Sequence, residues 1–338
     1  MKYLLPNFSH IYIERDADGY PLTELAKSRF PKATIVWIDN YKDVFNRIRQ
    51  DFHIQKESMK LILSIKKKPF LYSASSMVQE YNNPNTFYNT PALNCLYNCD
   101  YCFLQGMYNT GNIVLFVNED DFMKAVDKQL LNPIDPLKPT VLSISYNTDL
   151  LAMENIFSLA RNWIFFAKNK SDLIIEIRTK STLFSAIKDI KPLDNIILSW
   201  TLSPEKICEK YESTAPSLRK RLSAVHNALE LGWKVRLCFD PVLLIDDWDI
   251  QYDQLLKDTF SALNVKKIQD ITFGVFRMNK DYFNRIRKRE LDSVLYHKDY
   301  SIEGNTIVVE KKEREDALNK LKVIASKYFE NDKILIWQ

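Results

Sequence analysis

Three cysteines lie within eight residues of this chain, in the run Cys95-Leu96-Tyr97-Asn98-Cys99-Asp100-Tyr101-Cys102. Thiolates at this C-x3-C-x2-C spacing can each bind one iron of a cubic [4Fe-4S] cluster, which leaves the fourth iron without a protein ligand. An iron with an open coordination position can bind a substrate or a cosubstrate. Because the chain has only 5 cysteines, chance produces this spacing with a probability of about 0.001.

Two other interpretations of the cysteines stay open. A structural zinc site has four protein ligands, so the fourth would come from Cys208, Cys238 or a histidine remote in the sequence. Alternatively, all three are ordinary core residues, since an unmodified cysteine packs like a small apolar side chain. The spacing favours an iron–sulfur cluster over both.

Composition sets the class of protein. The chain has 338 residues, 46% of them hydrophobic, which suffices for one main domain and a smaller one. The net charge of +4 means that nucleic-acid binding would need a local basic patch. An odd number of cysteines, three of them clustered, indicates a reducing compartment, and no signal peptide or 18-residue apolar run is present. We expect a soluble, cytoplasmic protein without a membrane span.

Glycine motifs for nucleotide binding are missing from the sequence. The chain has 6 glycines, and neither G-x-G-x-x-G nor G-x-x-x-x-G-K-[ST] occurs. This argues against a Rossmann dehydrogenase and against a P-loop ATPase.

The first part of the chain alternates short apolar runs with a helical pattern. Strands are predicted at 11–14, 34–38 and 61–65, and a helix at 22–30. The polar segment 81–86 predicts a boundary loop. We therefore expect a small N-terminal α/β domain over residues 1–80.

After the cysteine run, apolar strands and helices alternate regularly. Strands are predicted at 141–145, 173–177, 196–200, 235–239 and 271–275, and helices at 153–167 and 216–231, the second with Thr214 as N-cap and Gly232 as the residue after its end. Such alternation predicts a parallel sheet wrapped by helices, a full or partial (β/α) barrel over residues 81–338.

Polar side chains follow these strands at their C-terminal ends, where such barrels carry their reactive groups. They are Tyr146-Asn147-Thr148-Asp149, Arg178-Thr179-Lys180, Thr201, Ser203, Asp240 and Arg277. Hydroxyl, carboxylate and cationic groups on one rim suit a zwitterionic, ribose-bearing cosubstrate. The alternative for each residue alone is a solvated loop position.

The cysteine spacing resembles that of radical S-adenosylmethionine (SAM) enzymes. The resemblance implies that the open iron chelates the amino and carboxylate groups of SAM. It also implies that an electron donor such as a flavodoxin or ferredoxin reduces the cluster. The reduced cluster then cleaves SAM into methionine and a 5′-deoxyadenosyl radical.

Over almost the whole chain the sequence is similar to the spore photoproduct lyase family. The similar pieces are Tyr12-Ile13-Glu14 with Tyr20-Pro21-Leu22, Cys102-Phe103-Leu104-Gln105, Phe116-Val117-Asn118-Glu119-Asp120, Thr148-Asp149, Tyr211-Glu212, Pro216-Ser217 and Arg221-Leu222. The resemblance implies a partial (β/α)6 radical SAM barrel with a C-terminal hairpin and helix extension. It further implies lyase activity on a thymine photoproduct in DNA.

The resemblance also assigns site residues. Cys95, Cys99 and Cys102 would bind the cluster, and Lys180, Thr201 and Ser203 would lie beside SAM. We count Tyr101, Thr148 and Asp149 with the SAM-binding residues as well, and Tyr101 with the catalytic ones.

Two departures from the family fall on the path that returns a hydrogen atom to the product. Tyr146 occupies the place of the family's hydrogen-donating cysteine, and Phe103 that of a tyrosine after the third cluster cysteine. We expect the Tyr146 phenol to donate the hydrogen atom. Cys238 is a second candidate, although a buried apolar role is the stronger interpretation for it. A changed substrate, either another DNA lesion or a non-DNA molecule, is the other explanation.

A basic run with interleaved aromatic residues follows the last predicted strand. Its cations, which we predict to contact DNA, are Arg277, Lys280, Arg285, Arg287, Lys288 and Arg289, and a hairpin turning at Gly304-Asn305 comes next. A solvated basic helix is the alternative. The class alternative for the whole chain is an iron–sulfur electron carrier without catalysis.

Overall fold

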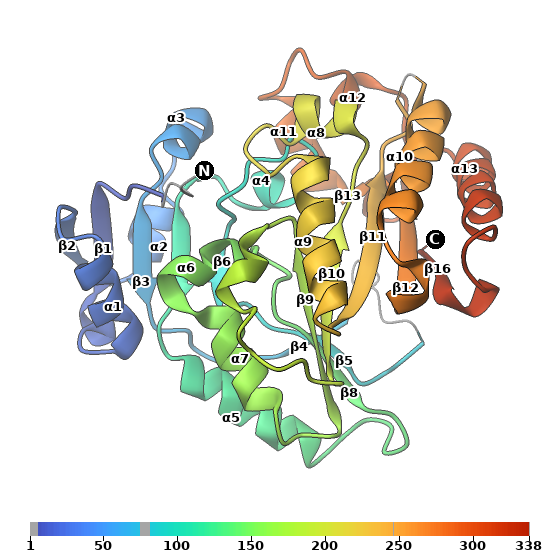
Figure 1. The fold of residues 1–338 in the computed structure, drawn as a ribbon. Helices are drawn as coiled ribbons and strands as arrows, with labels where there is room; N and C mark the ends of the chain where they lie inside the picture. Colours follow the sequence, from blue (N-terminus) through green and yellow to red (C-terminus); the bar gives the residue numbers. More distant parts are fainter. Residues whose placement is uncertain (1–5, 75–81, 246, 338) are drawn as a thin grey trace. The chain divides into compact units, whose positions relative to one another are not determined.

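The computed structural model describes residues 6–74, 82–245 and 247–337. These residues form two compact units, and each is built from two separate stretches of the chain (Figure 1). The first unit takes residues up to 96 and residues 108–179, and the second takes residues 97–107 and residues from 180 onward. The predicted separate domain over residues 1–80 stays a prediction, and Tyr81, where its boundary loop begins, lies outside the described residues.

The first unit opens with a sheet whose central strands are mostly apolar. Its strand order is β2 (Thr34–Ile38), β1 (His10–Glu14), β3 (Leu61–Ser64), β7 (Ile113–Phe116) and β6 (Ala92–Leu93). All pairs are parallel except β6 with β7. Every residue of β3 and β7 is buried, as expected for the centre of a parallel sheet. The helices here are α1 (Pro21–Arg29), α2 (Lys42–Phe45) and α3 (Phe52–Glu57).

Four further strands of the first unit pair in the order β9 (Leu173–Thr179), β8 (Thr140–Ser143), β5 (Thr86–Tyr88) and β4 (Tyr72–Ser73). Two longer helices accompany them, α5 (Glu119–Leu130) and α7 (Leu159–Ala167), and α7 packs on β9 (Figure 1).

The single helix predicted over 153–167 is wrong in one respect, because it is broken at Ser158. The backbone of Ser158 is left-handed, with φ of +52°, and separates α6 (Glu154–Phe157) from α7. The carboxylate of Glu154 accepts hydrogen bonds from the backbone N–H groups of Ala160 at 2.7 Å and Arg161 at 3.0 Å. This side chain satisfies donors that begin α7, so the chain can start a new helix there.

The second unit contains a parallel sheet in the order β16 (Ile334–Trp337), β12 (Asp270–Val275), β11 (Lys234–Val242) and β10 (Ile196–Thr201). Its long helices are α9 (Leu218–Glu230), α10 (Trp248–Ala262) and α13 (Lys311–Ala325). In this sheet α9 packs on β11 and α13 on β12, while α10 contacts both of these helices (Figure 1).

The predicted end of α9 is confirmed and its predicted start is wrong. Gly232 follows the helix with φ of +89°, a conformation that glycine adopts without steric cost. The N-cap position is held by Ser217 and not by Thr214. The Thr214 hydroxyl instead accepts a hydrogen bond from the backbone N–H of Asn98, at 2.5 Å.

Smaller elements of the second unit gather around the cysteine run. The predicted hairpin is present as β14 (Ser301–Glu303) and β15 (Thr306–Val308), and β13 (Arg277–Asn279) adds to it. The short helices are α4 (Leu104–Met107), α8 (Glu205–Tyr211), α11 (Lys280–Arg287) and α12 (Val294–His297). Figure 1 shows α4 beside α11, and the two helices are in contact.

Taken unit by unit, the architecture is mixed α/β, as predicted. Single 3-10 turns occupy Arg15–Ala17, Leu150–Met153, Leu183–Ala186, Val265–Lys267 and Asn331–Lys333. In the described ranges, no helix combines the length and apolar character needed to cross a membrane.

Candidate active site

Two of the three predicted cluster ligands lie on one tight turn. The backbone N–H of Cys102 donates to the carbonyl of Cys99 at 2.9 Å, and the N–H of Gln105 donates to the carbonyl of Cys102 at 3.1 Å as α4 begins. The side-chain amide of Gln105 reaches back to the Cys99 carbonyl at 2.7 Å and to Asn98 Oδ1 at 3.1 Å. Cys99 is buried and Cys102 is half-buried. The backbone that carries both thiols is therefore fixed by hydrogen bonds.

The same turn is held from three other directions in the second unit. The N–H of Asp100 donates to the carbonyl of Tyr211 at 2.8 Å, and the Tyr296 hydroxyl donates to the Asp100 carbonyl at 2.6 Å. Cys99 also belongs to an apolar core that includes Phe283 and Ile286 of α11. Residues more than a hundred positions away thus fix the cysteine turn.

Arginines of α11 and of the turn that follows it contact α4. Arg289 donates to the side-chain oxygen of Gln105 at 2.6 Å and to its carbonyl at 3.3 Å. Arg285 donates to the carbonyls of Gly106 and Met107. Both were predicted to contact DNA, and the structure gives each of them partners within the chain.

Cys95 belongs to the first unit, where Asn94 positions it. Asn94 has a left-handed backbone, with φ of +73°, and its amide donates to the carbonyls of Thr110 and Asn112. The Asn94 oxygen accepts the N–H of Cys95 at 3.0 Å, and the Lys56 ammonium donates to the Cys95 carbonyl at 2.6 Å. Sequence reasoning missed both residues, although asparagine is among the few non-glycine residues that adopt this conformation readily.

A buried ion pair lies next to the cysteine turn in the second unit. The Glu212 carboxylate accepts hydrogen bonds from Tyr101, from Arg221 and from Ser203, the last at 2.8 Å. The side chains of Glu212 and Arg221 are both 0% exposed. Arg221 also donates to the carbonyl of Thr201 at 3.2 Å. This network brings together three of the predicted SAM-binding residues, and its two charged members were noticed in the sequence only as pieces of the family resemblance.

Burial and charge oppose each other in this network. Burial by itself would raise the pKa of Glu212, but the positive charges of Lys180 and Arg221 outweigh it and lower that pKa to about 2. Burial, followed by the Glu212 charge, raises the pKa of Tyr101 well above its usual value. Glu212 is therefore an anion and Tyr101 a neutral phenol near neutral pH.

Lys180 is the remaining charged residue beside Glu212 and Tyr101. Its ammonium lies 5.3 Å from the centre of the Tyr101 ring. Burial opposes the charged form of Lys180, yet the Cys99 thiolate and Glu212 raise its pKa. The side chain is therefore a half-buried cation that can bind a carboxylate.

The predicted site residues of the first unit lie after β8. Asp149 accepts hydrogen bonds from the N–H of Ala152 at 3.1 Å and from the Thr179 hydroxyl at 2.7 Å, so it caps the turn over Leu150–Met153. The Thr148 hydroxyl and the side-chain amide oxygen of Asn147 (Oδ1) are buried. Within the described ranges, neither atom has a hydrogen-bond partner. Such groups cost free energy unless a ligand or water satisfies them, so they suit a polar cosubstrate.

Tyr146 stands at one end of a series of tyrosines. Its ring centre lies 4.5 Å from that of Tyr88, and Tyr88 stacks on Tyr72 at 5.1 Å. Tyr72 and Tyr88 are paired residues of the neighbouring strands β4 and β5. The ring of Tyr146 is thereby held in place, and its side chain is half-buried.

The other two cysteines do not resemble metal ligands. Burial raises the pKa of Cys208 to about 12, and its thiol donates to the carbonyl of Ser203 at 3.3 Å. Cys238 is completely buried inside β11.

The six cations predicted to contact DNA do not all face solvent. Arg277 forms an ion pair with Asp240 at 3.1 Å, and Arg285 and Arg289 bind α4. Arg287 and Lys288 are exposed, and Lys280 is half-buried.

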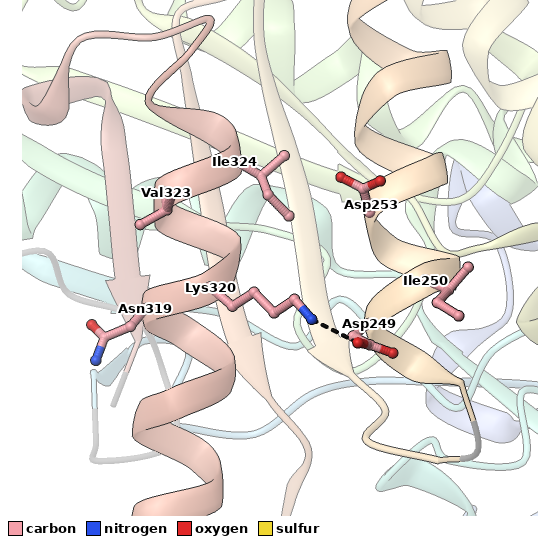
Figure 2. Close-up of a pocket in the computed structure, with 7 residues that line it drawn as sticks. All are labelled: Asp249, Ile250, Asp253, Asn319, Lys320, Val323 and Ile324. Atoms are coloured by element: carbon pink, nitrogen blue, oxygen red, sulfur yellow. Dashed lines mark hydrogen bonds and ion pairs between the residues drawn. The ribbon is translucent and has the colours of Figure 1, made fainter.

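Two surface hollows lie away from these residues in the chain. One, of about 540 Å³, is lined by α10 and α13, where Lys320 and Asp249 form an ion pair at 2.6 Å (Figure 2). The other, of about 960 Å³, lies in the first unit and is lined by Lys68, Lys124 and Lys128 together with Phe70. Neither contains a residue of the predicted site.

The donor types suit an iron–sulfur cluster, but among the described residues the side chains of His, Cys, Asp and Glu do not form a group of three that could hold a metal ion. Thiolates are the ligands that iron–sulfur clusters take, and the loop offers three of them at the required spacing. The class that the structure defines is a mixed α/β protein with a three-cysteine loop.

The chain belongs to the spore photoproduct lyase family, because the family model described as "Spore photoproduct lyase" matches residues 5–336. A curated spore photoproduct lyase from Clostridium acetobutylicum is 24% identical over 191 residues, which span 55% of this chain and only 55% of that relative.

Solved structures of spore photoproduct lyase have the same fold. An engineered variant matches with a TM-score of 0.83 at 16% identity, covering 99% of both chains. The enzyme complexed with dinucleoside spore photoproduct matches with a TM-score of 0.82 at 15% identity, covering 99% of both chains. A further variant, with bound AdoMet and dinucleoside spore photoproduct, matches with a TM-score of 0.81 at 16% identity and the same coverage.

Proposed function

We propose that this protein is a radical SAM lyase that repairs a thymine photoproduct of the spore photoproduct type in DNA. The observation that carries the proposal is the family match over residues 5–336 in a chain that retains the C-x3-C-x2-C loop. The related structures hold AdoMet and dinucleoside spore photoproduct, which supports both ligands for this chain. The finer architecture that we propose is a partial (β/α)6 barrel.

Cys95, Cys99 and Cys102 would hold a [4Fe-4S] cluster, which with SAM supplies a 5′-deoxyadenosyl radical when electrons arrive from a donor such as a flavodoxin or ferredoxin. Lys180, a half-buried cation, would bind the SAM carboxylate. Ser203 and Tyr101 are oriented by the hydrogen bonds that both donate to Glu212. Thr148 has a buried hydroxyl without a partner among the described residues, so it could bind SAM. Asp149 fixes the turn that follows it by accepting the N–H of Ala152. In the second unit, the carbonyl of Thr201 accepts a hydrogen bond from Arg221.

Tyr146 would return a hydrogen atom to the repaired thymine. A phenol O–H, like a thiol, can give up a hydrogen atom, and the contact with Tyr88 keeps the ring in one orientation. Tyr101 suits this role less well, because its hydroxyl is already donated to the buried Glu212 carboxylate. Cys238 would require β11 to open, since it is completely buried.

DNA would be held by cations after β12, namely the exposed Arg287 and Lys288 and the half-buried Lys280. The tyrosine in place of the family's thiol, together with Phe103, favours a second candidate, in which the same chemistry acts on another DNA lesion or on a non-DNA substrate.

The test is anaerobic reconstitution with iron and sulfide, followed by dithionite, SAM and an oligonucleotide that carries the photoproduct. We expect 5′-deoxyadenosine and two restored thymines. If 5′-deoxyadenosine forms with intact lesion, the second candidate is correct. If SAM stays uncleaved, the chain is an electron carrier and the proposal fails.

The role of Tyr146 is tested by Tyr146→Phe, with Tyr12→Phe as the matched control. The first variant should cleave SAM at the normal rate but yield thymine adducts in place of repaired thymine, because the product radical has lost its hydrogen donor. Tyr12→Phe should repair normally. Clean repair by Tyr146→Phe would overturn the assignment.

A further inference from the structure

The last backbone carbonyls of α4 are in contact with arginine side chains. This one-turn helix begins two residues after Cys102, and the last carbonyls of any helix lack partners within it. Here guanidinium groups supply the partners. Arg285 donates to the carbonyls of Gly106 and Met107, and Arg289 donates to that of Gln105 at 3.3 Å. Positive charge at this end also complements the helix dipole.

Gln105 extends the contact from Arg289 to the cysteine turn. The Arg289 guanidinium donates to the Gln105 side-chain oxygen at 2.6 Å, and the nitrogen of the same amide donates to the Cys99 carbonyl at 2.7 Å. A cation on the oxygen of an amide polarises it and strengthens the hydrogen bond that its N–H makes. Arg289 is thus two hydrogen bonds away from the peptide group of a predicted cluster ligand.

The backbones of α4 and α11 also touch. A Cβ atom at Gly106 would lie 2.4 Å from the Tyr282 carbonyl oxygen and 2.6 Å from its Cα, so only glycine allows this approach. On the same side of α11, Phe283 and Ile286 pack in the core that contains Cys99. Arg285, Arg287 and Lys288 are all exposed, but of these three it is Arg285 that donates to carbonyls of α4. The helix therefore has one side for the cysteine turn and another for solvent.

We propose that α11 is a brace for the cluster loop and that Arg285 and Arg289 are positioning residues for the metal centre, not phosphate contacts. The proposal rests on the proposed iron–sulfur function of the loop. It divides the basic run into two sets, of which Arg285 and Arg289 serve the cluster and Arg287 and Lys288 serve the DNA.

The proposal predicts how tightly the cluster is retained. Partners that orient metal ligands from the outer shell typically change metal affinity by about 10- to 100-fold when removed. Losing the Arg289 guanidinium would free the Gln105 amide and let the Cys99–Cys102 turn open. Iron should then leave more readily.

The experiment compares Arg289→Gln and Arg289→Lys with the control Arg287→Gln. Each protein is reconstituted anaerobically, and three quantities are measured: iron and sulfide bound per chain, the rate of iron release to a chelator, and affinity for duplex DNA. Amide hydrogen exchange of Cys102 and Gln105 in the metal-free proteins gives a readout that needs neither cluster nor activity.

We expect Arg289→Gln to release iron about 10 times faster than the wild type and to exchange these amides faster, with DNA affinity unchanged. Arg289→Lys should recover part of the loss, since it keeps the charge without the planar fork. If Arg289→Gln does not fold, the iron release and amide exchange of Arg289→Lys are compared with the wild type instead. Arg287→Gln should retain iron normally and bind DNA more weakly.

Retention of iron by Arg289→Gln at the wild-type rate, with weakened DNA binding, would overturn the brace. A wild-type protein that assembles no cluster would instead defeat the proposed function. The two failures are therefore distinguishable.

Discussion

Glu212 is the residue on which most of the buried polar contacts near the cysteine turn converge. Its carboxylate accepts from Tyr101, Ser203 and Arg221, and its charge faces Lys180 as well. Removing one partner of a buried ion pair leaves the other charge uncompensated. The structure of this part of the second unit therefore depends on one negative charge.

We predict that Glu212→Gln lowers the free energy of unfolding by about 3–5 kcal/mol, because Arg221 and Lys180 lose their counter-charge. Urea denaturation of the metal-free protein measures this. The control is Glu209→Gln, an exposed position on the neighbouring helix, which should change the value by less than about 0.5 kcal/mol. Equal effects of the two variants would contradict the prediction.

The same carboxylate predicts an acid dependence. The pKa of Glu212 is lowered to about 2 in the folded chain, against an ordinary value of 4.5. The folded state therefore binds fewer protons than the unfolded state between these values. The Glu212 contribution is complete above about pH 4.5 and is lost as the pH falls toward about 2. In Glu212→Gln, the unfolding free energy should decline less steeply over that range; parallel curves for both proteins would refute it.

At the scale of single elements, α5 begins with a carboxylate whose environment opposes ionisation. Burial raises the pKa of Glu119 to about 7, although the amide of Asn162 on α7 donates to it. A raised carboxyl pKa means that the folded state holds the extra proton, so this group favours folding less as the pH rises from about 4.5 to about 7.

We predict that Glu119→Gln, which mimics the protonated form, stabilises the protein by about 1–2 kcal/mol at pH 8 relative to its effect at pH 5. Thermal or urea unfolding at both pH values checks this. Glu209→Gln, at an exposed position on α8, is the control and should show no such difference. A gain from Glu119→Gln that is equal at both pH values would exclude the mechanism.

Strand β12 makes room for an ion pair at Gly274. A Cβ atom there would lie 2.7 Å from Asp240 Oδ1 and 3.0 Å from the Arg277 guanidinium. We predict that Gly274→Ala separates this pair and lowers the unfolding free energy by about 1–3 kcal/mol. In the Asp240→Ala background the same change should cost less, because the clashing carboxylate is gone. Additive effects in this double-mutant cycle would contradict the explanation.

Strands and helices with a regular spacing of apolar residues could be predicted from the sequence. Local breaks and caps, which depend on single contacts, could not. The strands at 11–14, 34–38 and 61–65 are present as apolar runs require. The break at Ser158 depends on where the Glu154 carboxylate reaches, which no residue period encodes. Thr214 has the right chemistry for an N-cap, but a contact remote in sequence, with Asn98, takes its hydroxyl.

At the scale of the whole molecule, the net charge offers little overall attraction for the DNA that we propose as substrate. The net charge is +4, and three members of the basic run bind groups within the chain. Only local cations remain for phosphates, so DNA affinity should depend weakly on salt.

We predict that the logarithm of the DNA association constant falls with the logarithm of salt concentration with a slope of about −3, from the phosphate contacts of Lys280, Arg287 and Lys288. Fluorescence anisotropy over a range of KCl concentrations measures the slope. A slope of −5 or steeper would mean that the remaining arginines also contact phosphates.

The cysteine site stays a prediction, and it comes from the spacing of three residues in one short segment. The three cysteines stand out because so few occur elsewhere in the chain. Asn94, Glu212 and the α11 arginines act through folding, so their roles emerge only when distant segments meet. The basic run illustrates this limit, because sequence counts charges but does not show which of them already have partners.

The discontinuous second unit has a consequence for biosynthesis. Gln105 is separated from Arg289 by 184 residues, so a ribosome must add nearly the whole C-terminal half before the two can meet. At about 5–20 residues per second this delay lasts roughly 10–40 s. During that interval the nascent thiols lack their final support. The proposed cluster should therefore be retained only once Arg289 has been made, and truncated chains that end before it should hold less iron.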